Sequence, residues 1–183
     1  MMGQTGLHMI FLVHLKSWIF DIDGNYMVGG GGGSIIFFYN GITWTILGLQ
    51  GMPCAISGSC VITGAGIYNL ESKIFTGLNF PESSYTWLED IDGDNIVGYY
   101  FHEDGIRHGF LYDGTAWITL DYPGASLTMI TGIDGYNIVG TYHDASGNKH
   151  GFIATIPEPA TIILFIFGGL VFQNKRTEKI WHR

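Results

Sequence analysis

Short apolar runs separated by Gly, Asp and Asn fill residues 17–156 of the chain. One example is Ile96-Val97-Gly98-Tyr99-Tyr100, which follows Asp92-Gly93. Asp-Gly and Asn-Gly favour tight hairpin turns, because these residues accept positive φ without much strain. No stretch before residue 159 shows a helical hydrophobic period. The pattern therefore predicts many short β-strands joined by tight turns.

The chain repeats itself at an interval of 42 residues. Segments 91–110 and 133–152 are identical at 12 of 20 positions, which chance does not give. A third copy starts at Ile22-Asp23-Gly24, and we interpret its glycine run, Gly29 to Gly33, as a shortened connector. A fourth, degraded copy lies in the middle, because Leu78-Asn79-Phe80-Pro81 matches Leu120-Asp121-Tyr122-Pro123.

One repeat unit has the length and the strand number of a propeller blade. We expect four strands in about 42 residues, the last of them being the segment from Leu127 to Ile133. A single unit of this kind cannot bury both of its faces, so several must stack. We therefore predict an all-β, propeller-like stack of about four short-stranded units over residues 17–156, which would make a small propeller or an incomplete arc of a larger one. A flat or sandwich-like β-array is the alternative.

A different pattern begins at Pro157. An uncharged apolar stretch, 160–172, predicts one C-terminal hydrophobic helix that spans roughly 20 Å, against about 30 Å for the hydrocarbon core of a bilayer. A basic tail, 173–183, follows it and includes Lys175 and Arg176. Under the positive-inside rule these cations favour a cytoplasmic C-terminus, which would place the repeats outside the cytoplasm. The alternative is a buried terminal helix or strand of the domain.

Composition and charge narrow the class of protein further. A hydrophobic content of 46% excludes a disordered chain. The formal net charge of -8 argues against nucleic-acid binding. Residues 1–174 carry 15 acidic and 4 basic side chains, whereas the last nine residues carry 4 basic and 1 acidic. The tail therefore has a role separate from that of the acidic body.

The C-terminal segment resembles the PEP-CTERM protein-sorting signal of Gram-negative bacteria. The similarity rests on the order of three parts: Pro157-Glu158-Pro159, the short apolar stretch and the basic cluster. It implies recognition and cleavage near Pro157-Glu158-Pro159 by an exosortase, a membrane-embedded processing enzyme. The protein would be anchored transiently in the membrane and would then reach the cell envelope or the extracellular matrix.

The repeats in turn resemble HAF-type extracellular repeats. His-Gly-Phe stands at 108–110 and at 150–152, with Ile-Asp-Gly-x-Asn-Ile-Val-Gly ahead of each. By contrast, the N-terminal extension, 1–16, lacks the features of a secretion signal: residues 1–8 hold no Lys or Arg, and no small-residue cleavage site follows. We expect a truncated or misannotated start, or a decayed gene.

Few residues suggest site chemistry, and each has a structural interpretation. Asp90, Asp92 and Asp94 could form a calcium loop, but Asn95 and Phe101 stand where an EF-hand-type loop needs Gly and Glu, so we favour a turn. A phosphate loop at the glycine run lacks the Lys-Ser/Thr ending. We assign no metal site and no cofactor.

The repeated histidines and tryptophans allow two interpretations each. His108 and His150 occupy equivalent positions, which favours structural hydrogen bonds, and we expect no nearby acid or nucleophile to complete a triad. Trp18 aligns with Trp87, and Trp44 with Trp117. Their repetition favours packing between units, and a row of exposed aromatics that stacks on sugar rings is the alternative.

Cys54 and Cys60 complete the set of candidate residues. Five residues lie between them, and a disulfide that closes this small loop is open from sequence, as is a pair of thiols. Taken together, the sequence predicts an exported, non-enzymatic surface or extracellular-matrix repeat protein with no catalytic residues. A lectin-like module that binds extracellular polysaccharide is the alternative, and a hydrolase on a propeller scaffold is disfavoured.

Overall fold

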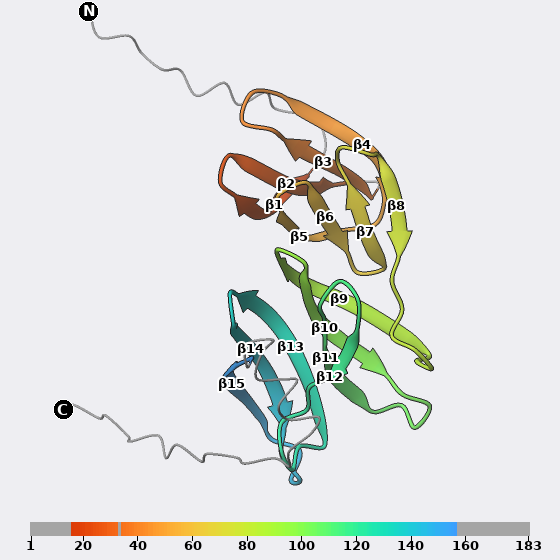
Figure 1. Ribbon diagram of the computed structural model, residues 1–183, viewed down its shortest axis with the longest axis vertical. Coiled ribbons are helices and arrows are strands. Elements are labelled where there is room, and N and C mark those ends of the chain that lie inside the picture. The colour runs from red at the N-terminus through yellow and green to blue at the C-terminus, as the bar shows by residue number, and fades with distance from the viewer. Residues whose placement is uncertain (1–15, 33, 157–183) are drawn as a thin grey trace, which may run out of the picture.

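The computed structural model describes residues 16–32 and 34–156, which form fifteen β-strands. The strands make four small antiparallel sheets, arranged as four propeller blades in an open array. Figure 1 shows blade 1 at one end of the array, blade 4 at the other, and blades 2 and 3 between them. The prediction of an all-β fold built from about four repeat units is confirmed. The expected hydrophobic helix, 160–172, lies outside the described residues.

Each blade is formed by strands that are consecutive in the sequence. Blade 1 consists of β1 (Ser17–Asp23), β2 (Tyr26–Gly31), β3 (Ile35–Tyr39) and β4 (Trp44–Gln50). Blade 2 consists of β5 (Pro53–Ser57), β6 (Cys60–Thr63), β7 (Gly66–Asn69) and β8 (Ile74–Gly77). Blade 3 consists of β9 (Tyr85–Asp92), β10 (Asn95–Phe101), β11 (Arg107–Tyr112) and β12 (Trp117–Thr119). Blade 4 has three strands in the described chain: β13 (Leu127–Asp134), β14 (Asn137–His143) and β15 (Lys149–Thr155).

The boundary of the repeat unit differs from the expected one. We expected the segment from Leu127 to Ile133 to be the last strand of a unit, but β13 is the first strand of blade 4. The reason is the tight turn at Gly135, which has φ 56° and pairs Asp134 with Asn137 across one hairpin. The same hairpin joins the first two strands of each of the other blades.

The glycine run of the third copy also has a different role from the expected one. Gly29, Gly30 and Gly31 lie within β2, where they pair with β1 on one side and β3 on the other, so they are not a connector. A Cβ atom on Gly29 would collide with the ring of Phe37. The glycines therefore let an aromatic side chain pack directly on the strand.

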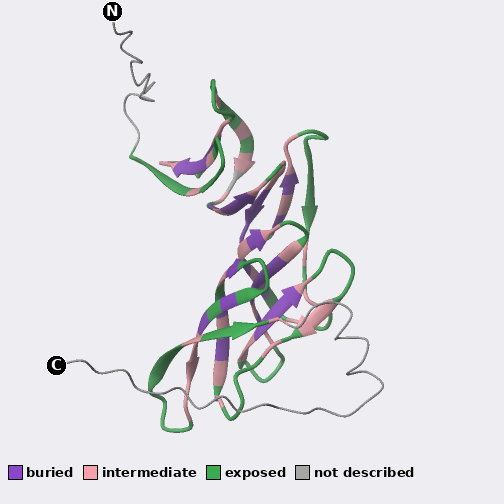
Figure 2. Ribbon diagram, turned by 60° about the vertical axis from the view of Figure 1, so that its left-hand side comes forward, coloured by how far each residue is buried: buried purple, intermediate pink, exposed green. Residues whose placement is uncertain are grey.

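An apolar cluster fills each junction between neighbouring blades. Val28 and Ile36 of blade 1 pack with Ile56 and Val61 of blade 2. Comparable clusters join blade 2 to blade 3 and blade 3 to blade 4. Figure 2 shows the buried residues on the strands and exposed residues at the hairpin tips. The core is thus a series of inter-blade layers, as expected for stacked repeats.

The link from one blade to the next is repeated as well. The main-chain N–H of Phe80 donates to the Thr86 hydroxyl at 2.9 Å, and that of Tyr122 donates to the Thr128 hydroxyl at 3.0 Å. The ring of Phe80 stacks on Tyr100 at a centroid distance of 3.7 Å. The link that follows the middle copy therefore matches the link that follows blade 3, which supports the assignment of the middle copy as a degraded repeat.

Candidate functional site

Carboxylates of one blade bind main-chain amides of the next blade. Asp21 accepts a hydrogen bond from the Ile56 N–H at 2.8 Å, and Asp23 accepts one from the Gly58 N–H at 2.6 Å. Asp21 lies on β1 and Asp23 at its end, and each partner lies one position beyond the equivalent residue of blade 2, on β5 or in the turn that follows it. These bonds are charge-assisted, so they tie blade 1 to blade 2 more strongly than neutral ones would.

The same arrangement recurs at the other junctions. Asp90 accepts from the Ile133 N–H at 2.8 Å, and Asp92 accepts from the Gly135 N–H at 2.6 Å. Between blades 2 and 3 the Ser57 hydroxyl takes the place of the second aspartate and accepts from a glycine N–H at 3.0 Å. The first strands of the four blades, which are the innermost ones, are thereby linked in the order β1, β5, β9 and β13.

This use of the aspartates bears on the calcium interpretation. Asp90 and Asp92 point to blade 4, whereas Asp94 lines a different hollow between blades 2 and 3. Asp92 ends β9 and pairs with Asn95, so Gly93 and Asp94 form the tight turn between β9 and β10, and a turn is what we favoured from sequence. Burial raises the pKa of Asp90, although hydrogen bonds from the Ile133 and Ile91 amides oppose the rise.

The innermost strands of all four blades border a shallow axial hollow of about 250 Å³. Most of its polar lining consists of the junction carboxylates and Ser57. In the described residues, Asp21, Asp23, Asp90 and Asp92 are already committed to main-chain amides. Four of the five aspartates that line the hollow therefore serve as structural acceptors, and Asp134 is the fifth.

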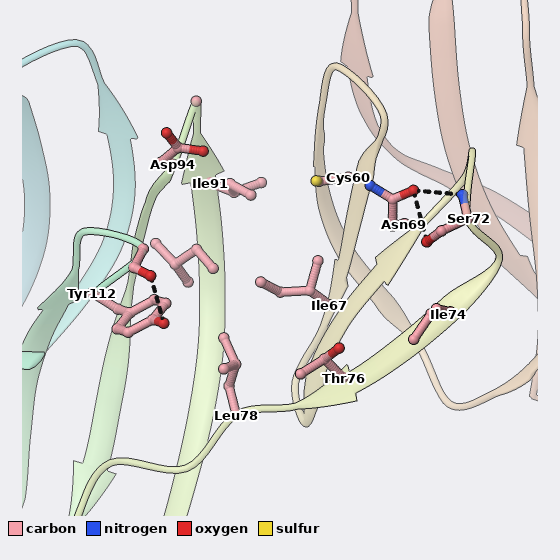
Figure 3. A pocket seen from close by; sticks show the side chains of 13 residues that line it. Cys60, Ile67, Asn69, Ser72, Ile74, Thr76, Leu78, Ile91, Asp94 and Tyr112 are labelled. Carbon is pink, nitrogen blue, oxygen red and sulfur yellow. Dashed lines mark hydrogen bonds between the residues drawn. The ribbon is translucent and has the colours of Figure 1, made fainter. Parts of the chain in front are cut away.

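A second hollow, of about 420 Å³, lies between blades 2 and 3 and is shown in Figure 3. Apolar side chains such as Ile67 and Ile91 line its floor, with Asn69 at the rim. The Asn69 side-chain oxygen accepts hydrogen bonds from the main-chain N–H and the hydroxyl of Ser72, at 2.8 and 3.1 Å. The side chain of Asn69 thus stabilises the turn between β7 and β8.

The histidines have acidic partners that the sequence did not predict. His108 Nδ1 lies 2.6 Å from an Asp121 carboxylate oxygen, and the His108 ring stacks on Tyr100. Sequence reasoning missed this acid, because Asp121 is brought back to His108 by the linker after β12. Thirteen residues separate the two, so no local motif marks the pair.

His150 has a different acid at the equivalent position. His150 Nε2 lies 2.9 Å from Asp144, and the ring stacks on Tyr142. Hydrogen bonds from the His150 side chain, and then from Asn148, hold the pKa of Asp144 well below its ordinary value. The prediction of structural hydrogen bonds at the two histidines is confirmed.

The repeated tryptophans are used mainly for packing. Trp44 packs edge-on against Phe37, and Trp117 packs in the same way against Phe110. Trp87 lies over Gly64 of the preceding blade, so close that a Cβ atom there would collide with the indole. Trp18, the equivalent of Trp87 in blade 1, is exposed. The described chain therefore does not turn its repeated tryptophans outward as a row.

The two cysteines are both free thiols in the structure. Cys60 pairs with Ser57 across the β5–β6 hairpin, whereas Cys54 lies three residues further along β5, roughly 10 Å away by strand rise. This separation exceeds the reach of a disulfide. Burial, and then the charges of Glu89 and Asp90, raise the pKa of Cys54 to about 12.

The predicted processing residues, Pro157, Glu158 and Pro159, and the basic residues Lys175 and Arg176 lie outside the described residues. Within 16–32 and 34–156, no helix is long and apolar enough to cross a membrane.

Comparison with known proteins gives little further information. No family model matches the chain, and no curated protein matches it. The solved structures include two similar ones, both of computationally designed proteins. The match to Ika4 has 16% identity and a TM-score of 0.46, and covers 78% of this chain and 93% of Ika4. The match to Ika8 has 17% identity and a TM-score of 0.46, and covers 78% of this chain and 47% of Ika8.

Proposed function

We propose that this protein is an exported, non-enzymatic surface or extracellular-matrix protein. An exosortase sorts it and cleaves it near Pro157-Glu158-Pro159, and the segment that follows anchors it in the membrane until cleavage. The observation that carries the proposal is the position of the last strand: β15 ends at Thr155, two residues before Pro157. A cut at the motif would thus leave every described strand on the released side.

The use of polar residues in the described chain supports a structural role. The junction aspartates bind main-chain amides, and the two equivalent histidines are tied to aspartates at strand starts. These are the residue types from which acid–base sites are built, and here they hold blades and turns in place. Glycan binding has no comparable support, because three of the four repeated tryptophans are packed and only Trp18 is exposed.

The proposal is tested by mass spectrometry of the protein's C-terminus in cells with and without the exosortase. With the enzyme, we expect a C-terminus close to Pro157-Glu158-Pro159, and without it an intact Arg183. Glu158→Ala should slow the cleavage, whereas Glu178→Gln, outside the three-part motif, should not. An intact Arg183 in both strains would refute the sorting assignment.

A further inference from the structure

Blade 1 leaves exposed a face that every other blade buries. Ile56, Ile91 and Ile133 occupy equivalent positions on the first strands of blades 2, 3 and 4, with exposures of 3%, 6% and 9%. The equivalent residue of blade 1, Ile22, is 57% exposed. Ile19 is 52% exposed, whereas its counterpart Leu88 is fully buried. Blade 1 therefore exposes the face that, in blades 2 to 4, packs against the preceding blade, and no described residue covers it.

Blade 4 leaves the opposite face exposed. Val97 and Leu111 of blade 3 are 0% and 2% exposed because blade 4 packs on them. Their counterparts in blade 4, Val139 and Ile153, are 44% and 73% exposed. Val139 and Ile153 lie on the face that, in blades 1 to 3, packs against the following blade. The two faces that form a blade junction are therefore both exposed, one at each end of the array.

The polar groups of the junction are divided between the two ends in the same way. Asp134 occupies the position of Asp92, but it accepts no hydrogen bond from any described residue. Gly24 occupies the position of Gly135, the amide that Asp92 binds. An interior junction needs only one such acceptor, since Ser57 alone serves between blades 2 and 3.

We propose that these end faces bind a second copy of this chain, with blade 4 of each copy packed on blade 1 of the other. Two copies of four blades each then form a closed ring of eight blades with two-fold symmetry. The second copy is the occupant we favour because it continues a junction that already occurs three times within the chain. It brings the apolar face and the main-chain amide that each end requires.

The test uses the full chain in a mild detergent, which accommodates the apolar stretch 160–172, with its mass measured by sedimentation. We expect a dimer for the native chain. Ile22→Lys and Ile153→Glu should each weaken the dimer by about 100-fold or more, because each buries an unpaired charge in both junctions. Ile42→Lys, at a hairpin turn where the side chain is 83% exposed, is the matched control and should leave the dimer intact. Thermal unfolding followed by circular dichroism checks that each variant is folded.

Mixing the two interface variants gives the sharper readout. In a mixed ring, one junction keeps both native isoleucines, and the other pairs the introduced lysine of one copy with the introduced glutamate of its partner. The mixture should therefore recover the dimer that each variant alone has lost. A native chain that is monomeric throughout would overturn the proposal, because its ends would then be covered by segments 1–15 or 157–183 or by nothing. A dimer unaffected by Ile22→Lys and Ile153→Glu would also overturn it.

Discussion

At the scale of single residues, hydrogen-bond acceptors are placed where one blade meets the main chain of the next. Asp23 and Asp92 each hold a glycine amide at 2.6 Å, in two junctions of identical design. A hydrogen bond to a charged group contributes about 1.5–3 kcal/mol, so two per junction add substantially to a small apolar interface. Asp90 shows the opposing effect, because its burial raises its pKa and disfavours the charged form that makes these bonds.

The thiol of Cys54 should be unreactive in the folded protein. Its pKa of about 12 leaves little thiolate near neutral pH, whereas unfolding returns the pKa towards its ordinary value of 9.0. In a Cys60→Ser variant, we expect the reaction with a disulfide reagent at about pH 8 to be on the order of 100-fold slower than in denaturant, and to accelerate as the pH rises. Counting thiols of the native sequence in denaturant should give two, and a count of zero would show that the cysteines are bonded.

At the scale of strands, glycines set how closely neighbouring strands and rings approach. A Cβ atom on Gly98 of β10 would collide with the carbonyl oxygen of Trp87 and crowd the ring of Phe110. The same holds for Gly140 of β14, which faces the Met129 carbonyl and the ring of Phe152. The repeated glycine is therefore a packing requirement of the second strand and does not mark a turn.

Gly98→Ala should destabilise the fold by about 2–3 kcal/mol, because the obstructing atoms include main-chain atoms that cannot move freely. Gly77→Ala is the matched control: its strand, β8, is the outermost of blade 2, and the nearest atom to an added Cβ lies 3.9 Å away. We expect the control to change the free energy of unfolding by less than about 1 kcal/mol. Urea unfolding followed by tryptophan fluorescence measures both, and equal effects would contradict the packing argument.

At the scale of the whole molecule, stability is approximately a sum over junctions, because the main packing contacts in the described residues join each blade to its neighbours in sequence. The buried side chains fall into three clusters, one per junction. Leu88, at the middle junction, is fully buried and holds the two halves of the array together. A fault there would divide the array into two pairs of blades.

Leu88→Ala should therefore destabilise the protein by about 2–5 kcal/mol and broaden its unfolding transition. Ile74→Ala, on the outermost strand of blade 2 with its side chain 61% exposed, should lie within about 0.5 kcal/mol of the native chain. Differential scanning calorimetry distinguishes the two outcomes. A single sharp transition with unchanged midpoint in Leu88→Ala would show that the middle junction carries little of the stability.

Period and strand number could be predicted from the sequence, because the Asp-Gly turns and the 42-residue interval are local signals. The phase of the repeat could not, since an interval does not say which strand begins a blade, and β13 was assigned to the wrong unit. The junction acceptors were also missed. Asp21 and Asp90 bind amides 35 and 43 residues away, and only the packing of whole blades brings these groups together.

The main-chain partners at the junctions have a consequence for how such a protein grows over evolutionary time. Every amino acid except proline supplies a main-chain N–H. Asp21 or Asp92 can therefore bind an added blade whatever side chains that blade carries at the bonded position. Duplication of the gene segment for one unit thus adds a blade that can form the junction hydrogen bonds immediately, and the sequences of the copies can then diverge. The degraded middle copy, in which Ser57 stands where the other copies have an aspartate, is the outcome that such divergence would produce.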